Sequence, residues 1–598
     1  MSRHPAIEQC QIVDRYRLQR QLARARNADQ RKSLENKIAA SVSRSEERRS
    51  ALPAIRYPDA LPVSNKAEEI IRQIRQHRVL VVAGETGSGK STQLPKMCLA
   101  AGQGIFGQIA HTQPRRIAAR AISARLSEEL NLEVGAGVGY RVRFDEKCSA
   151  SDYIRVLTDG MLLAEAQTDR FLNQYDTVIV DEAHERSLNI DFLLGVLQQL
   201  LLKRKDLKVI ITSATIDTEK FSKHFDNAPI INVSGRTYPV EVRYQPPEDP
   251  KTRSDHQTNR SILEAIQGLF RSHPGHTLVF LPGEREIREA QRFLQRQLKS
   301  GIEIHPLYAR LAGSEQAKLF RPSQATRIIL STNVAETSLT LPGIEYVIDT
   351  GLARVSRYSP GRRVNTLPIE RISRAAADQR KGRCGRVREG ICVRLYSEED
   401  FQSRDDFTAP EILRTALSGV VLALKSRRLG EPENFPFIDP PERRQWNAAR
   451  NELRILGALD ADKKLTRIGR TLAALPVDPR IGRMLYAAAK AEGCLSEISI
   501  LAASLEIPDP RIVPHDSMQA ARQHHLEQAK GSCDFFAMLS LYAEFDIQRR
   551  QLSRKQLSEW CRKNFLAPSR MREWQDLVKR LRQEMNTLES PLNRDPAS

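Results

Sequence analysis

The feature that most constrains this chain is a glycine-rich segment, Gly84-Glu85-Thr86-Gly87-Ser88-Gly89-Lys90-Ser91, with a strand pattern before it and a helix pattern after it. Glycines let a backbone curl so that its N–H groups, together with the N-terminus of the next helix, face phosphate oxygens. The segment therefore predicts a phosphate-binding loop in an α/β domain with a parallel sheet. The alternative is a glycine-rich turn in a domain that binds no nucleotide.

Nucleotide contacts are expected from this whole segment and from the residue that follows it. The Lys90 ammonium would neutralise the β- and γ-phosphates, and the Ser91 hydroxyl would ligate Mg²⁺. The expected nucleotide-binding residues of the loop are Gly84, Glu85, Thr86, Gly87, Ser88, Gly89, Lys90, Ser91 and Thr92.

Two acidic residues, Asp181 and Glu182, directly follow a second apolar run at residues 177–180. Residues at the carboxyl ends of buried parallel strands line the sites of α/β proteins. Asp181 can hold Mg²⁺ through water, while Glu182, also counted among the metal ligands, can polarise the water that attacks a γ-phosphate. Such a pair alone is also typical of a solvated loop, but its combination with the phosphate loop favours catalysis.

The run at residues 379–386 carries three polar side chains at a regular spacing: Gln379, Arg383 and Arg386. Their spacing of three or four residues predicts that they share one face of a helix. Two guanidinium groups presented together can stabilise the charge on a transferring phosphoryl group, as arginine fingers do. The alternative is a basic helix face on a basic protein.

Composition limits the classes of protein that this chain can be. Apolar residues make up 40% and charged residues 28% of the 598 residues, and no apolar run approaches the ~20 residues that span a bilayer. The start of the chain does not resemble a secretory signal, so we expect a cytoplasmic protein. The eight cysteines form no C-x-x-C pair and imply no zinc site. The net charge of +20 suggests a polyanionic partner.

Strand and helix patterns divide the chain into two α/β lobes and a helical remainder. The runs RVLVVAG, QIAHTQP, YDTVIVDEAH and KVIITSAT predict the first parallel sheet. A second series, HTLVFLPG, IEIHPLYA, TRIILST, EYVIDTG and GICVRLY, predicts the second. Beyond about Ser397 helical periodicity continues to the end, interrupted by the proline-containing segments FPFIDPP, LPVDP and IPDPRIVP.

The motifs together carry a family resemblance. GETGSGKST, TQPRRIAAR, TDGML, DEAH, SAT, LVFLPG, STNVAETSLTL and QRKGRCGR occur in the order of the DEAH-box helicases of superfamily 2, and in detail they resemble the bacterial HrpA-type members. The resemblance covers residues 57–589. LTRIGRTLAALPVDPRIGRML and FPFIDPP resemble the winged-helix and ratchet regions of that family.

The resemblance implies a fold and an activity. It implies hydrolysis of ATP or other nucleoside triphosphates with Mg²⁺, single-stranded RNA as the substrate, and translocation from 3′ to 5′. The expected divisions are a basic N-terminal arm, helical or partly disordered (1–56), two RecA-like lobes (57–235 and 236–397), a winged-helix-like domain (398–470), a ratchet-like domain (471–590) and a tail (591–598).

The resemblance also assigns roles to individual residues. Gln379, Arg383 and Arg386 resemble the γ-phosphate sensors of the family, and His184, Ser213 and Thr215 would couple the nucleotide state to the other lobe. The base would be stacked between Arg125 and Phe320, which tolerates any base because every base has a π-face. The alternatives are an exposed helical arginine at Arg125 and a core or interface aromatic at Phe320.

A further set of residues resembles the RNA-backbone contacts of the family, because hydroxyls and arginines suit phosphate and 2′-OH groups. These are Arg115, Arg116, Thr158, Asp159, Arg236, Thr237, Thr332 and Thr337. Residues 352–373, which turn at Ser359-Pro360-Gly361, resemble the β-hairpin that the family inserts as a strand-separating wedge. A plain surface hairpin is the alternative.

Two other functions agree with the same motifs. One is a DNA helicase, and the other is an ATP-gated RNA-binding clamp or assembly factor that never unwinds, although such a clamp would be expected to lack Glu182 or the two arginines. The resemblance further suggests a monomer and an mRNA or ribosome-associated substrate. The sequence ends at Ser598, soon after the ratchet-like region and without the OB-fold that the family normally carries next. We expect this loss to affect the coupling to RNA more than the chemistry of ATP hydrolysis.

Overall fold

The computed structural model describes residues 5–587 except 86, 144, 215–217, 234–237, 248–254, 299–300, 309–310, 312–318, 320–322, 324, 337–340, 360–363, 387, 491–492, 515–516 and 530–532. The chain divides into two compact units. The first unit comprises Met1–Thr415 and Pro436–Pro440, and the second, called the helical unit below, comprises Ala416–Phe435 and Pro441–Ser598.

The first lobe of the first unit is built on an eight-stranded sheet in the order β4-β3-β5-β2-β6-β7-β1-β8. Every pair of neighbours is parallel except β3 and β4. The strands are β1 (Val79–Gly84), β2 (Gln108–Gln113), β3 (Val138–Val142), β4 (Asp145–Lys147), β5 (Ile154–Thr158), β6 (Tyr175–Val180), β7 (Lys208–Ser213) and β8 (Ile230–Val233). The four predicted strands correspond to β1, β2, β6 and β7, which are neighbours at the centre of the sheet.

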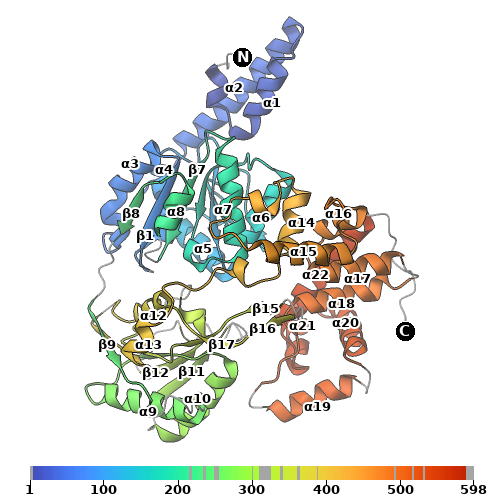
Figure 1. Cartoon of the computed structure of the whole chain (residues 1–598). Coiled ribbons are helices and arrows are strands. Elements are labelled where there is room, and N and C mark those ends of the chain that lie inside the picture. The colour runs from blue at the N-terminus through green and yellow to red at the C-terminus, as the bar shows by residue number, and fades with distance from the viewer. Residues whose placement is uncertain are drawn as a thin grey trace. The chain divides into compact units, whose positions relative to one another are not determined.

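Helices cover the first sheet on both faces (Figure 1). The helices are α3 (Ala67–Gln76), α4 (Lys90–Ala100), α5 (Arg116–Glu129), α6 (Asp159–Thr168), α7 (Leu188–Leu201) and α8 (Thr218–His224). Helices α3, α4 and α5 share one apolar core cluster with alternate residues of the strands, such as Leu80 and Val82 of β1. Because both faces are buried, strands β1, β6 and β7 read as largely apolar runs, which made them visible in the sequence.

The second lobe has a six-stranded parallel sheet in the order β11-β12-β10-β13-β18-β9. Its strands are β9 (Val240–Tyr244), β10 (Thr277–Phe280), β11 (Ile302–Leu307), β12 (Thr326–Ser331), β13 (Tyr346–Asp349) and β18 (Gly390–Arg394). Successive side chains of β10 point to opposite faces of the sheet, so Leu278 and Phe280 join one core cluster and Val279 joins another. Helices α9 (Asp255–Phe270) and α10 (Glu284–Gln297) pack on the face that carries Val279. The prediction of two parallel-sheet lobes is confirmed.

The predicted hairpin at residues 352–373 is present. Its base pairs β14 (Leu352–Arg354) with β17 (Ile369–Arg371), and its outer part pairs β15 (Arg357–Ser359) with β16 (Val364–Thr366), both antiparallel. Residues 360–363, which include most of the expected turn, lie outside the described residues.

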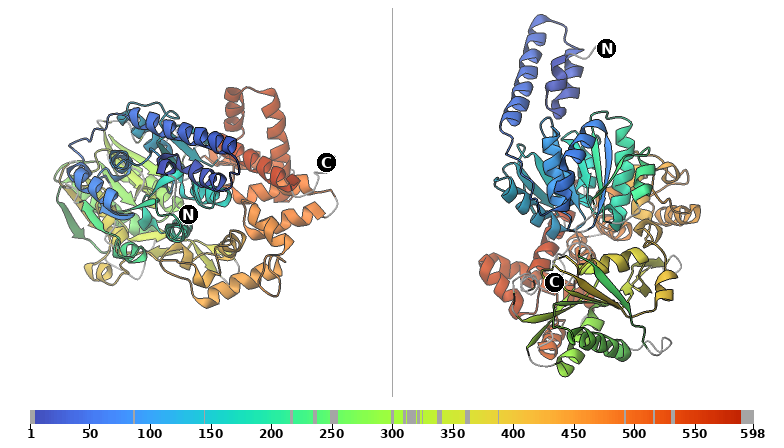
Figure 2. Two further views of the ribbon diagram at one scale, coloured as in Figure 1. Left: turned by 90° about the horizontal axis from the view of Figure 1, so that it is seen from above. Right: turned by 90° about the vertical axis from the view of Figure 1, so that its left-hand side faces the viewer.

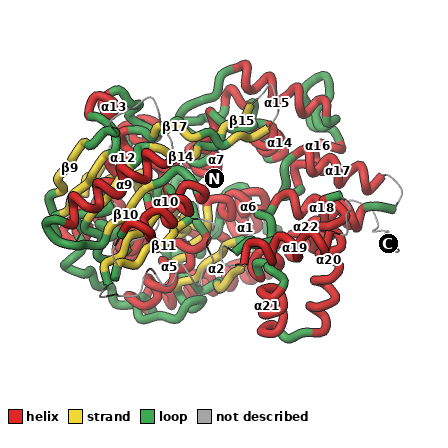
Figure 3. Tube along the Cα trace, turned by 90° about the horizontal axis from the view of Figure 1, so that it is seen from below, coloured by secondary structure: helices red, strands yellow, loops and turns green. Residues whose placement is uncertain are grey.

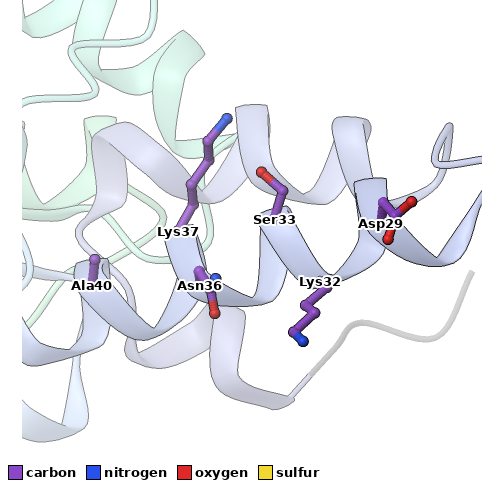
Figure 4. Close-up of a pocket in the computed structure, with 6 residues that line it drawn as sticks. All are labelled: Asp29, Lys32, Ser33, Asn36, Lys37 and Ala40. Carbon is purple, nitrogen blue, oxygen red and sulfur yellow. The ribbon is translucent and has the colours of Figure 1, made fainter.

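The N-terminal segment forms a helical hairpin that stands on the first lobe (Figure 2). It consists of η1 (Pro5–Gln9), α1 (Ile12–Leu22) and α2 (Ala28–Ser50). Cys10, Leu18, Leu34 and Ile38 form a small apolar core between the helices. Asp29, Lys32, Ser33, Asn36, Lys37 and Ala40 line a shallow depression on the outer side of α2 (Figure 4), and all of them belong to that one helix.

Arg48, near the end of α2, fastens this hairpin to the first lobe. Its guanidinium donates to the carbonyls of Gly104 (2.7 Å), Ser151 (2.8 Å) and Asp152 (3.0 Å), and it lies 4.6 Å from the ring centroid of Tyr153. A half-buried charge that satisfies several carbonyls is costly to remove, because each acceptor loses its donor.

We therefore expect Arg48→Ala to weaken the docking of the hairpin by about 1.5–3 kcal/mol, the range for hydrogen bonds to a charged group. Limited proteolysis should then cut the chain near residues 50–60 faster than in the parent, while the lobes stay protected. Arg49→Ala is the matched control, since the exposed Arg49 makes only a cation–π contact with Phe106 at 5.7 Å. Equal protection of Arg48→Ala and the parent would contradict this role for Arg48.

The described part of the helical unit consists of helices and loops, as predicted (Figure 3). The helices are α14 (Ser418–Ser426), α15 (Arg443–Ile455), α16 (Arg467–Ala474), α17 (Pro479–Lys490), α18 (Leu495–Glu506), α19 (Met518–Ala529), α20 (Asp534–Gln551), α21 (Arg554–Lys563) and α22 (Pro568–Thr587). The buried Trp574 ties α22 to α18 by donating to the Ile500 carbonyl at 2.9 Å. Among the described residues, no helix combines the length and apolarity needed to cross a membrane.

Candidate nucleotide site

The phosphate loop lies between β1 and α4, where the sequence predicts it. Gly87 and Gly89 adopt φ of +95° and +91°, a conformation that side-chain-bearing residues rarely adopt. A Cβ on Gly84 would lie 2.7 Å from the carbonyl oxygen of Val233 on β8. The glycines are thus required by backbone conformation and by close packing, and the loop leads into the N-terminus of an eleven-residue helix.

Lys90 is buried at the start of α4, and its ammonium lies inside the loop. It donates to the Glu85 carbonyl at 2.9 Å, to the Ser88 hydroxyl at 3.2 Å and to the Gly84 carbonyl. Burial lowers the pKa of Lys90, while the charges of Glu182 and Asp181 oppose that shift. A cation desolvated in this way gains strongly from a bound polyphosphate, because the new negative charge replaces the lost hydration.

Asp181 is held by a polar cradle from the two strands that flank β6. Its Oδ2 accepts from Gln113 Nε2 at 2.6 Å and lies 3.2 Å from His111 Nε2, both on β2, while its Oδ1 accepts from the Thr212 hydroxyl on β7. Burial alone would raise the pKa of Asp181, but the contacts with His111, Ser91 and Thr212 hold it well below its usual value. The carboxylate is therefore ionised and fixed in orientation.

Glu182 follows directly, and its backbone has φ of +52°, the left-handed conformation. Its N–H donates to Asp181 Oδ1 at 3.0 Å and to the Thr212 hydroxyl at 3.2 Å. Burial and the charge of Asp181 raise the pKa of Glu182, and Lys90 opposes the rise. A carboxylate that is costly to ionise binds a proton more strongly than an exposed one does, as a general base requires.

His184 joins this site to the loop after β7. Its Nδ1 accepts from the Ala214 N–H at 3.1 Å, so the neutral ring carries its proton on Nε2, which lies 3.4 Å from Glu182 Oε2. Burial and the charge of Lys90 lower the pKa of His184 to about 3, so the ring is neutral at physiological pH. Ser213, predicted to share its coupling role, is buried at the end of β7.

Arg383 and Arg386 do not lie on a helix face, so that prediction is wrong. Helix α12 (Arg374–Lys381) holds Gln379 but ends before both arginines. Gly385 has φ of +73°, and a Cβ there would come within 2.4 Å of Val240 on β9. The glycine-permitted turn, rather than helical periodicity, therefore brings the two guanidinium groups together.

Both arginines are nevertheless close to the phosphate site. A Cβ placed on Gly87 would lie 3.8 Å from the Arg386 guanidinium. Burial and the charge of Arg386 lower the pKa of Arg383 to about 9, and the nearby Glu182 partly offsets this. Burial likewise lowers the pKa of Arg386, offset by Glu85. Two desolvated cations from the second lobe thus border the phosphate loop of the first.

Arg380, which sequence reasoning missed, holds this turn in the second lobe. Its buried guanidinium donates to Asp349 Oδ1 at 2.7 Å and to Glu336 Oε2 at 2.9 Å, and it lies 4.7 Å from the ring centroid of Phe280. Arg383 donates to the backbone carbonyl of the same Glu336. The arginine run therefore has one structural member and two members that face the site.

The structure also places the other residues singled out in the sequence. Arg115 contacts Glu185 and the Val334 carbonyl, both at 3.4 Å, and Arg116 begins α5. Thr158 precedes α6, and Thr332 precedes the short η4 (Asn333–Ala335). The predicted site residues Thr86, Thr215, Arg236, Thr237, Phe320 and Thr337 lie outside the described residues.

The surroundings of Asp159 and Arg125 do not match the contacts that are expected of these residues. Asp159 is buried at the start of α6, and burial raises its pKa to about 7, which favours a role in holding that helix over contact with RNA. Arg125 is half exposed and donates to Glu129 at 2.8 Å and Glu128 at 2.9 Å on its own helix, so stacking on a base would require these pairs to rearrange.

The oxygens around Asp181 suit magnesium. The Ser91 side chain lies near enough to the Asp181 carboxylate to help lower its pKa, which brings a hydroxyl and an ionised carboxylate together beside Lys90. Mg²⁺ prefers such hard oxygen ligands, usually one or two from the protein with the remainder from phosphate and water. The residues present therefore fit this ion.

Four protein-family profiles match the chain. "DEAD/DEAH box helicase" covers residues 64–223, and "Helicase conserved C-terminal domain" covers residues 259–388. "Helicase associated domain (HA2), winged-helix" covers residues 449–477, and "Helicase associated domain (HA2), ratchet-like" covers residues 478–576. The first two fall within the two sheet lobes, and the other two lie in the helical unit.

Curated relatives agree with these profiles. The chain is 49% identical over 99% of its length to "ATP-dependent RNA helicase HrpA" of Escherichia coli, and 51% identical over 94% to its homologue in Haemophilus influenzae. It is 40% identical over 88% to "Probable ATP-dependent RNA helicase DHX34" of Homo sapiens. The chain spans 46%, 44% and 46% of these relatives, less than half of each. With the phosphate loop, the Asp181–Glu182 pair and the arginine turn in place, the chain belongs to the DEAD/DEAH-box helicases and is similar to the HrpA-type members.

Proposed function

We propose that this chain is an RNA-stimulated nucleoside triphosphatase that converts hydrolysis into 3′ to 5′ movement along single-stranded RNA, and thereby unwinds duplexes or remodels RNA–protein complexes. The observation that carries the proposal is the position of Arg383 and Arg386, which belong to the second lobe but border the phosphate loop and Glu182 of the first. A site completed by two lobes can be opened and closed by whatever moves them.

The residues divide the chemistry among them. The loop N–H groups and Lys90 hold the phosphates, and the Glu182 carboxylate accepts a proton from the attacking water. Arg383 and Arg386 stabilise the charge that spreads over the phosphoryl oxygens. Asp181 and Ser91 would hold Mg²⁺, which, when bound, neutralises phosphate charge. His111, Gln113 and Thr212 position Asp181 without contacting substrate.

The RNA contacts are proposed from the family pattern. Arg115, Arg116, Thr158 and Thr332 follow strand ends or begin helices, where hydroxyl and guanidinium groups suit the sugar–phosphate backbone. The hairpin β14 to β17 would act as the wedge that separates strands. The names of the relatives above support RNA as the nucleic acid.

The direct test compares hydrolysis by the purified chain with matched single-stranded RNA and DNA. Stimulation by RNA well above that by DNA supports the proposal. Equal stimulation by both would favour the DNA-helicase alternative, whereas RNA-stimulated hydrolysis without displacement of a duplex strand would favour the ATP-gated clamp.

Little discrimination among ATP, GTP, CTP and UTP is expected. The chain has no glutamine-bearing base-reading segment before the phosphate loop, and the proposed base contacts of Arg125 and Phe320 are stacking ones. Steady-state kinetics with the four nucleotides measure this. A preference for ATP in kcat/KM above ~100-fold, or ~2.7 kcal/mol, would require hydrogen-bond readout and contradict the prediction.

A further inference from the structure

The turn that follows Glu182 is strained and is held from outside the sheet. Glu182 (φ +52°) and Arg186 (φ +46°) both adopt the left-handed conformation, on either side of η3 (Ala183–Glu185). Side-chain-bearing residues rarely adopt this conformation, and they keep it only where surrounding contacts impose it. The contacts of Arg186 therefore help to impose the backbone conformation of Glu182.

Arg186 is buried between two carboxylates. Its Nε and one terminal nitrogen donate to Asp191 at 2.6 and 3.2 Å, and that same nitrogen donates to Asp439 Oδ2 at 2.7 Å. Asp191 belongs to α7 of the first lobe, whereas Asp439 comes from Pro436–Pro440, far along the chain. Phe437 of the same segment stacks on Phe192, with the ring centroids 6.5 Å apart.

A second segment holds the backbone of the same turn. The Glu411 N–H donates to the Arg186 carbonyl at 3.0 Å, and the Glu411 carboxylate accepts from the Leu188 N–H at 2.9 Å. Glu411 begins η5 (Glu411–Leu413). Side chain and backbone of Arg186 are thus fixed by two different stretches of chain.

These two stretches are the connections to the helical unit. The chain passes into that unit after Thr415, returns at Pro436 and leaves again after Pro440. Glu411 and Asp439 therefore lie close in sequence to the crossing points. A displacement of the helical unit must pull on the covalent segments that clamp Arg186.

We propose that Arg186 is a positioning residue, and that the Glu411 and Asp439 clamp conveys displacements of the helical unit to Glu182 during the RNA-stimulated cycle. Stimulation of hydrolysis by RNA then depends on the Arg186–Asp439 pair. The inference rests on the proposed function, because it presupposes stimulation by RNA. The clamp can couple the helical unit to Glu182 because it biases the conformation of the strained turn that carries this residue.

Asp439→Asn tests this most cleanly, because the amide keeps the shape and removes the charge. Saturating single-stranded oligouridine is the RNA probe. The RNA-stimulated kcat should fall about tenfold, an ordinary size for coupling between sites, while the unstimulated kcat, the KM for ATP and the affinity for oligouridine stay within about twofold. Lys220→Ala is the matched control, since the half-exposed Lys220 approaches the same carboxylate at 3.8 Å, and it should match the parent.

Arg186→Lys is the second variant, because it retains a charge but loses the planar fork. It should lower the stimulated rate more than the unstimulated one, with one nucleotide still bound per chain in a titration with a fluorescent ATP analogue. Equal losses in both rates, or parental stimulation in Asp439→Asn, would overturn the inference. If RNA does not stimulate the parent itself, the proposed function fails before any variant is compared.

Discussion

Glu182→Gln is expected to bind nucleotide and RNA like the parent and to lose turnover by about 10²- to 10⁴-fold, the usual contribution of a general base. The amide keeps the size and the hydrogen bonding of the side chain but cannot accept the proton of the attacking water. Steady-state hydrolysis, combined with binding of a fluorescent ATP analogue, separates turnover from affinity.

Glu185→Gln is the matched control for this experiment. Glu185 lies on the same short turn, but its carboxylate contacts Arg115 at 3.4 Å. Its unstimulated hydrolysis should therefore stay near that of the parent. Parental turnover by Glu182→Gln would remove Glu182 from the mechanism.

Arg383→Ala and Arg386→Ala are each expected to lower RNA-stimulated hydrolysis by ~10³ or more, as the loss of arginine fingers does. Burial lowers the pKa of both side chains because their charges are poorly solvated, so a phosphoryl group beside them would be strongly stabilising. Burying a cation costs free energy, which offsets the loss of the Arg383 contact with the Glu336 carbonyl, so thermal unfolding near the parent Tm is expected.

Lys381→Ala provides the control for the arginine pair. Lys381 lies in the same run but pairs with Asp378 on α12 at 3.3 Å. It should hydrolyse ATP at the parent rate. If Arg383→Ala and Arg386→Ala also did so, the two-lobe site described above would be wrong.

The central strands and the phosphate loop could be predicted because each depends on residues adjacent in sequence. Strands β1, β6 and β7 are buried on both faces and read as largely apolar runs, whereas the edge strand β4 has the polar sequence Asp-Glu-Lys and gives no such signal. The predicted helix face for Arg383 and Arg386 failed because periodicity cannot foresee the turn that Gly385 permits.

The cradle around Asp181 could not be predicted in the same way. His111, Gln113 and Thr212 meet Asp181 only because β2 and β7 flank β6 in the sheet, an order that the sequence does not state. The TQP motif contained a signal for Gln113, since it places an amide at the end of a buried strand. The clamp on Arg186 depends in the same way on segments that are distant in sequence.

The most direct test of the central claim is steady-state ATP hydrolysis by this 598-residue chain, measured with and without saturating single-stranded RNA for the parent and for Arg383→Ala and Arg386→Ala. A nucleotide site completed by the second lobe predicts strong stimulation by RNA in the parent and almost none in either variant. RNA stimulation that persists undiminished in both variants would contradict the account, because hydrolysis would then not need the second lobe.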